Sequence, residues 1–217
     1  MSLGAPSNKR LKAGGARRLR NESFFRAPQL KRDPLDGAAD QLCMPDLPSL
    51  IELHAAVAAF LATADRSGAA WSTPRAPGKW SPSQVLEHVA LIMEESANVV
   101  AGARSKFPTI PRALRPVARL LVFKRILRRG AFLRMKAIEA FKPPVGAATP
   151  AAGRVRVERA LARFDESSRA RAAAGGKVAS TIFGPVSVSD FVRFQELHVR
   201  HHHEQLRVNE PRRLTSA

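Results

Sequence analysis

The 217-residue chain has one cysteine, no tyrosine and half as many acidic as basic side chains. Because Cys43 has no second cysteine to pair with, an internal disulfide and a cysteine metal cluster are both excluded. A single reduced thiol is typical of a cytoplasmic setting. No apolar run approaches the roughly 20 residues that a membrane-spanning helix needs, so we expect a soluble protein.

The net charge of +18 is concentrated in two segments. Residues 1–43 hold nine Lys/Arg against four acids, and residues 104–142 hold twelve against one, which leaves a surplus of only two elsewhere. In the second segment the only aromatic side chains among the cations are Phe107, Phe123, Phe132 and Phe141. With so few rings to stack on bases and a nearly neutral remainder, nucleic acid is a disfavoured partner.

The basic N-terminal segment lacks a periodic apolar face. Residues 1–43 mix Gly, Pro, Arg and Asp, a composition typical of a disordered tail. Met44 stands just before the first helix signal and is an alternative to Met1 as the start of translation. We therefore expect a tail over 1–43, one helical domain over 44–210 and a short tail over 211–217. A chain begun at Met44 should keep its helical content.

Two helices in the first half of the domain have clear start signals. Ser49 with Glu52 three residues later forms the pattern of a capping box, and Gly68 follows the end of the apolar stripe. Ser81 with Gln84 repeats the pattern, and a proline occupies the first helical position between them. Apolar residues recur at helical spacing after both starts, so each helix is expected to bury one face.

Two more long helices are expected in the second half. One covers about 154–173, and the other follows a cap at Ser187 with Asp190 in its first turn. Only 178–183 shows the alternation of a strand. The sequence therefore predicts an all-α protein.

The basic stretch between these pairs is amphipathic. Residues 113–141 are predicted to form one or two helices, broken near Gly130. Membrane-surface helices have such a pattern, but so has a lid helix with a solvated basic side, which we favour. We expect the apolar residues to face the other helices, so that contact with anionic membranes is weak. These residues are Leu114, Leu120, Leu121, Phe123, Ile126 and Leu127.

Three histidines are predicted to converge in the core. Residues four apart lie on one face of a helix, so His198 and His202 are stacked neighbours on the face that carries Phe191 and Phe194. His88 occupies the apolar face of the second helix in the same way. Burying imidazoles is costly unless each nitrogen has a partner, and a shared metal ion supplies one.

Simpler explanations exist for each histidine taken alone. A lone buried histidine is usually a hydrogen-bonded core residue, and the run 201–203 has the composition of a solvated basic patch. His203 points away from the face of His198, and His54 on the first helix is interpreted as structural. Glu95 is two turns from His88, so it is at most an outer partner of a site and is more simply a capping or surface residue.

The combined motifs resemble a known superfamily. The segment 80–84 (Trp-Ser-Pro-Ser-Gln) leading to His88, then Phe183-Gly184, then the run from His198 to Gln205, resembles the DinB-like superfamily, and an uncharacterised branch of it most closely. The resemblance spans about 47–208. It implies a DinB-like antiparallel four-helix bundle with an extra basic helical insert.

The resemblance also implies a site and a chemistry. One histidine of the second helix and two of the last would bind a divalent metal, which matches His88, His198 and His202; Gln205 resembles a family position but is not assigned as a ligand. Zinc is the first choice, with nickel, iron or manganese as alternatives. Three neutral imidazoles leave positions open for water or substrate, and metal affinity should fall as pH drops through the imidazole range near ~6.5.

Three function classes follow. The first is a metal-dependent enzyme, a thiol S-transferase or hydrolase-like enzyme in detoxification, which takes a small-molecule substrate and a low-molecular-weight thiol. The second is a non-catalytic metal-binding stress protein. The third is a basic helical protein that binds membrane surfaces. A homodimer is compatible with any of them.

Overall fold

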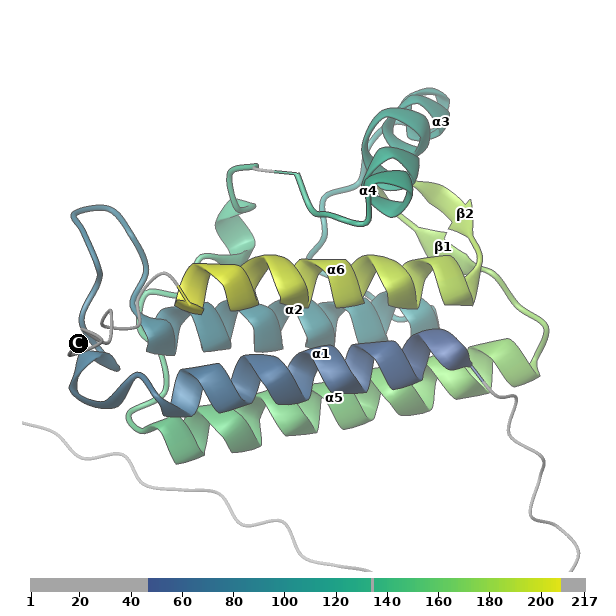
Figure 1. Cartoon of the computed structure of the whole chain (residues 1–217). Coiled ribbons are helices and arrows are strands. Elements are labelled where there is room, and N and C mark those ends of the chain that lie inside the picture. Colours follow the sequence, from purple (N-terminus) through teal and green to yellow (C-terminus); the bar gives the residue numbers. More distant parts are fainter. Residues whose placement is uncertain (1–46, 134, 208–217) are drawn as a thin grey trace, which may run out of the picture. The chain divides into compact units, whose positions relative to one another are not determined.

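Four long helices dominate the computed structural model, which describes residues 47–133 and 135–207, all within the unit Leu42–Ala217. They are α1 (Pro48–Asp65), α2 (Pro82–Ala101), α5 (Pro150–Ala173) and α6 (Val188–Arg207) (Figure 1). The most extensive helix contacts join α2 to α5 and α1 to α6, and α2 also contacts α6. The described part of the chain is therefore mostly helical, as predicted; the tails expected over 1–43 and 211–217 lie outside it.

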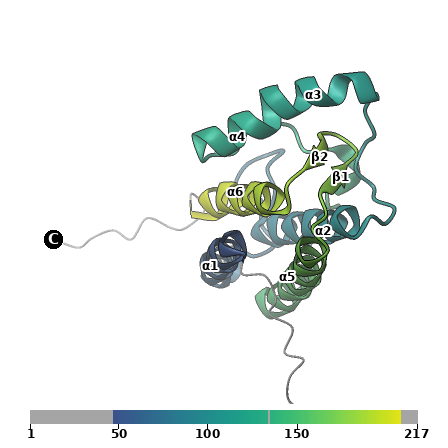
Figure 2. The same ribbon diagram turned by 90° about the vertical axis from the view of Figure 1, so that its right-hand side faces the viewer.

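Shorter elements connect these helices. They are η1 (Gly68–Ala70), η2 (Arg112–Leu114), α3 (Arg115–Ala118), the π-helical turn η3 (Arg119–Phe123), α4 (Lys124–Arg129), η4 (Glu139–Phe141), β1 (Val178–Ser180) and β2 (Gly184–Val186). The two strands pair antiparallel as a small hairpin. Figure 2 shows α3 and α4 on the side of α6 that faces away from α1 and α5.

The second helix starts as its sequence predicts. The Ser81 hydroxyl accepts a hydrogen bond from the Gln84 backbone amide, and the Gln84 side chain accepts one from the Ser81 amide, so the capping box is formed. The box predicted at Ser49 is wrong. That helix begins one residue earlier, at Pro48, because proline has no amide hydrogen to leave unbonded in a first turn. Leu47 is the cap residue and gives no side-chain hydrogen bond.

The two later helices also have side-chain caps. The Thr149 hydroxyl accepts from the Ala152 amide, which starts α5 four residues before the predicted position. The Ser187 hydroxyl accepts from the Asp190 amide at 3.1 Å, as predicted.

One apolar core joins all four long helices. Phe60 of α1, Met93 of α2, Phe164 of α5 and Leu197 of α6 belong to one cluster of buried side chains and are almost fully inaccessible to solvent. No helix in the described ranges combines the length and apolar character needed to cross a membrane.

The basic stretch departs from its prediction in two ways. It is helical only from η2 to α4, where Gly130 ends it in a left-handed conformation, and apart from the short η4 its described second half is not helical. Phe123 and Ile126 are buried and Leu127 partly so, but Leu114, Leu120 and Leu121 are exposed. The physical reason is that the π-helical turn departs from α-helical spacing, so the apolar residues of this stretch do not share one side. Phe123 packs on Phe194 of α6, whereas the leucines just before it face outward.

Candidate metal centre

The structure brings His88, His198 and His202 together between α2 and α6. All three side chains are buried, with 4 to 7 % of their surface exposed. One ring nitrogen from each lies within 4.8 Å of the others, and Nε2 of His198 is 3.1 Å from Nε2 of His202. The rings meet edge to face, at centroid separations of 4.6 to 5.3 Å. Three nitrogen lone pairs can therefore converge on one point.

In two of these rings, Nδ1 is hydrogen-bonded to an oxygen atom outside the cluster. Nδ1 of His88 lies 2.7 Å from the Phe141 carbonyl oxygen, and Nδ1 of His202 lies 2.9 Å from the Gln205 side-chain oxygen. Because a carbonyl or amide oxygen can only accept, each Nδ1 must carry the hydrogen and donate it. The lone pair is then on Nε2 of both rings, which is the nitrogen a metal would need.

The Gln205 side chain has a second contact that supports this orientation. Its amide nitrogen lies 3.1 Å from Nε2 of His201, to which it can donate. Gln205 therefore joins His201 to His202, with its oxygen on the ring that belongs to the cluster. The sequence could not assign this role, although Gln205 lies one turn after His201 on the same side of α6.

Burial keeps the cluster uncharged. Desolvation lowers the pKa of His88 despite its hydrogen bond to Phe141. Desolvation, with repulsion from the neighbouring histidines, lowers the pKa of His198 well below its usual range and that of His202 to about 3. All three rings are thus neutral at pH 7, the form that binds metals. The predicted loss of metal affinity at low pH is not tested by the structure, and the lowered pKa values would move it below the ordinary imidazole range.

The remaining histidines have other partners. His203 faces α1, where its Nε2 lies 2.9 Å from the Thr63 hydroxyl, and His54 lies 2.6 Å from the Asp165 carboxylate on α5. His54 is thus engaged in a contact between helices, in line with its structural interpretation.

Glu95 also has a local structural role. Its carboxylate accepts hydrogen bonds from the Lys106 backbone amide at 2.9 Å and from the Asn98 side chain at 3.2 Å. Burial raises the pKa of Glu95, but these hydrogen bonds together outweigh that effect and lower the pKa. They also hold the loop after α2. Glu95 therefore acts as a capping partner, the simpler of the two predicted roles.

A cavity of about 1270 Å³ opens onto the histidine cluster. The apolar side chains that line it include Trp80, Val85, Ile92, Phe107, Val122, Phe132, Leu133, Phe183 and Phe194. The Trp80 ring lies 4.7 Å from the His88 ring, and the Phe132 ring 5.1 Å from the His198 ring. The cluster is therefore at the wall of an apolar chamber large enough for a small organic molecule.

The cavity also has polar and charged lining residues outside the histidine cluster. Gln195 is 2 % exposed, and its side-chain oxygen is buried without a hydrogen-bond partner within the described residues. The exposed cations that line the cavity are Arg75, Lys79, Lys136 and Lys142, with Glu204 as the exposed acid. Sequence reasoning missed Gln195, although it lies three residues before His198 and so on the same helix face.

Comparison with known proteins identifies a family but no activity. The family model described as a protein of unknown function (DUF1569) matches residues 48–209. No curated protein and no solved structure matches the chain.

Proposed function

The chain belongs to DUF1569, a family of proteins of unknown function, and we propose that it binds one divalent metal ion, zinc in the first place, with His88, His198 and His202. The observation that carries the proposal is that Nδ1 of His88 and Nδ1 of His202 each have an oxygen acceptor, which leaves Nε2 of both rings for a metal. Metal-binding histidines usually donate their second nitrogen in this way, which sets the tautomer and the ring orientation. Here the Phe141 carbonyl and the Gln205 amide oxygen do so for two of the three rings.

The donor set is that of a reactive metal site. Three neutral imidazoles leave at least one coordination position for another ligand, as in catalytic zinc sites, whereas structural zinc sites are closed by four protein ligands. When bound, such an ion supplies Lewis acidity, which lowers the pKa of a thiol or water that coordinates it. Nickel, iron and manganese are alternatives that the imidazole donors also accept.

The cavity supports a small-molecule substrate. Its mostly apolar lining favours an organic molecule beside the histidine cluster. The unpartnered Gln195 oxygen would accept a hydrogen bond from such a molecule after a small shift of its side chain. The exposed cations would attract an anionic co-substrate, such as a low-molecular-weight thiol with carboxylate groups. We therefore propose a metal-dependent transferase that uses such a thiol, with a hydrolase-like reaction as the alternative.

We also infer membership of the DinB-like superfamily and an antiparallel four-helix bundle. The inference is supported by four long helices around one core and by the origin of the histidines, one from α2 and two, four residues apart, from α6. The basic η2–α4 segment would then be an insert between the second and third helices of that bundle.

Metal analysis of the untagged full-length protein tests the proposal. We expect about one metal ion per chain in the wild type and loss of most of it in His88→Ala, His198→Ala and His202→Ala, because two imidazoles form a much poorer site. His203→Ala is the matched control on the same helix and should keep its metal. Circular dichroism should show that every variant stays helical.

Two outcomes would contradict the proposal. The first is a wild-type protein that contains no metal and takes none up from solution. The second is loss of metal in His201→Ala while His202→Ala retains it. The ligand would then be His201, which contacts the Gln205 amide nitrogen, and not His202, which contacts its oxygen. A protein that binds metal but conjugates no thiol to any electrophile would instead be a metal-binding protein without turnover.

A further inference from the structure

A run of apolar side chains is exposed on the outer side of the η2–α4 segment. Leu114, Val117, Leu120 and Leu121 each expose between 51 and 58 % of their surface. They come from one short stretch of consecutive helical turns. Isolated exposed leucines are common, but several within two or three turns form a patch that marks an interaction surface.

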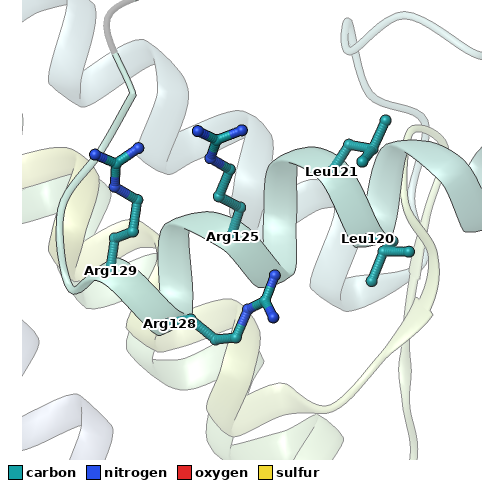
Figure 3. Close-up of a pocket in the computed structure, with 5 residues that line it drawn as sticks. All are labelled: Leu120, Leu121, Arg125, Arg128 and Arg129. Carbon is teal, nitrogen blue, oxygen red and sulfur yellow. The ribbon is translucent and has the colours of Figure 1, made fainter.

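Arginines extend this patch along the helix. Figure 3 shows Leu121, Arg125 and Arg129 on one side of the helix, with Leu120 and Arg128 on another. Within the described part of the chain, the three arginines make no hydrogen bond or ion pair with the protein. These five residues line one pocket, so the two sides together form one outer surface. With Leu114 and Val117, they are called the basic apolar face below.

The inner side of the same segment is anchored. The Phe123 and Ile126 side chains are fully buried, and the Phe123 ring packs on those of Phe183 and Phe194. Arg119 donates to the Pro185 carbonyl of the hairpin, and Lys124 pairs with Asp190 of α6 at 2.8 Å. These contacts fix which side of the segment is buried. The segment therefore cannot rotate about its axis to bury the leucines of the basic apolar face.

We propose that the basic apolar face docks the protein on an anionic lipid bilayer. The two components match the two zones of such a surface, since leucines enter the boundary between headgroups and acyl chains while arginines pair with lipid phosphates. A nucleic acid would use the arginines but leave four aliphatic side chains exposed, and the face has no aromatic ring to stack on bases. A second copy of the chain would bring like charges together.

The proposal is independent of the metal site but has a consequence for it. Ala118 and Val122, on the inner side of the same turns, line the cavity that opens onto the histidine cluster. One short helical segment therefore separates the proposed lipid contact from that cavity. A bilayer-docked protein would hold its cavity within a helix diameter of the membrane, roughly 10 Å.

Vesicle flotation with the full-length protein tests the docking. The probes are vesicles of phosphatidylcholine alone and of phosphatidylcholine with phosphatidylglycerol, in low and in physiological salt. We expect binding only to the anionic vesicles. Because each cation near such a surface contributes about fivefold in affinity, Arg125→Glu/Arg128→Glu/Arg129→Glu should weaken binding about 100-fold or more. Leu120→Ser/Leu121→Ser should weaken it about tenfold.

Matched variants separate this face from the overall charge. Arg104→Glu/Arg159→Glu/Lys177→Glu makes the same charge change at exposed sites elsewhere, and Ile51→Ser/Val155→Ser removes the same kind of exposed apolar side chain from α1 and α5. Both controls should bind vesicles within about threefold of the wild type. The basic residues of segment 1–46 are present in every variant, so their contribution cancels in the comparison.

Three results would overturn the proposal. The wild type fails to bind anionic vesicles, the control charge variant loses as much affinity as the arginine variant, or the leucine variant binds like the wild type. If the leucine variant binds like the wild type, binding to double-stranded DNA should be measured in parallel, because a nucleic-acid surface would depend on the arginines and not on the leucines. Metal content should be unchanged in all of these variants, so failure here would leave the metal proposal untouched.

Discussion

Acid should destabilise the metal-free protein more steeply than a typical helical domain. His88, His198 and His202 are buried and neutral, and burial lowers the pKa of each in the folded state. In the unfolded chain the same rings take up protons near their ordinary pKa of ~6.5. Below that pH the unfolded state therefore binds more protons than the folded state, so stability falls as the pH falls.

The size of this effect follows from the number of rings. Each histidine that is protonated only on unfolding costs about 1.4 kcal/mol per pH unit once the pH is well below ~6.5. His198 and His202, whose pKa values burial lowers furthest, give a slope approaching about 3 kcal/mol per pH unit, and the smaller shift of the His88 pKa adds to it. Since a domain of this size is stable by only about 5–15 kcal/mol, one or two pH units should remove much of its stability.

Urea unfolding of chelator-treated protein between pH 7.5 and 5.0 measures the slope. This range stays above the point at which carboxylates with lowered pKa values, such as those of Glu95 and Asp165, lose their contribution to stability. Replacing His202 with Ala should reduce the slope by about one proton, or about 1.4 kcal/mol per pH unit. Stability that is flat from pH 7 to 5, or a slope that His202→Ala leaves unchanged, would refute the conclusion that the cluster is buried and uncharged.

Three further substitutions have expected outcomes. Gln205→Leu removes the oxygen that orients His202 and should weaken metal affinity about 10- to 100-fold, measured by competition with a chelator. Gly153→Ala should destabilise the protein by about 1–3 kcal/mol in urea unfolding despite the better helix propensity of Ala, because a Cβ there would lie 2.9 Å from the Trp71 ring. Ser81→Ala removes the capping box of α2 and should cost about 1 kcal/mol in the same assay.

Each substitution has its own check. Glu204→Leu changes an exposed neighbour of Gln205 and should leave metal affinity unaltered; equal losses would mean that the amide does not orient the ring. A raised unfolding midpoint in Gly153→Ala would show that the Trp71 ring yields easily. The reference for Ser81→Ala is Ser167→Ala. The Ser167 hydroxyl donates only to the Arg163 carbonyl of its own helix, so this substitution should lower the free energy of unfolding by less than about 0.5 kcal/mol.

Local signals in the chain were sufficient for most of the helices. The box of Ser81 and Gln84 and the cap at Ser187 work over three residues, so the structure repeats them as predicted. The capping box predicted at Ser49 did not form for a local reason too. Pro48, one residue earlier, is favoured in the first turn of a helix, so α1 begins there. Helical periodicity likewise placed His198 and His202 on one face of α6, a consequence of about 100° per residue.

What tertiary structure alone decided is how distant segments meet. The Phe141 carbonyl that is hydrogen-bonded to His88 lies 53 residues further along the chain, and no rule of sequence spacing predicts this contact. The outward turn of Leu120 and Leu121 depends on a π-helical turn and on which side of the segment packs against α6. Caps and periodicity are set by neighbouring residues, whereas the partners of a buried ring and the exposure of an amphipathic face are set by packing between helices.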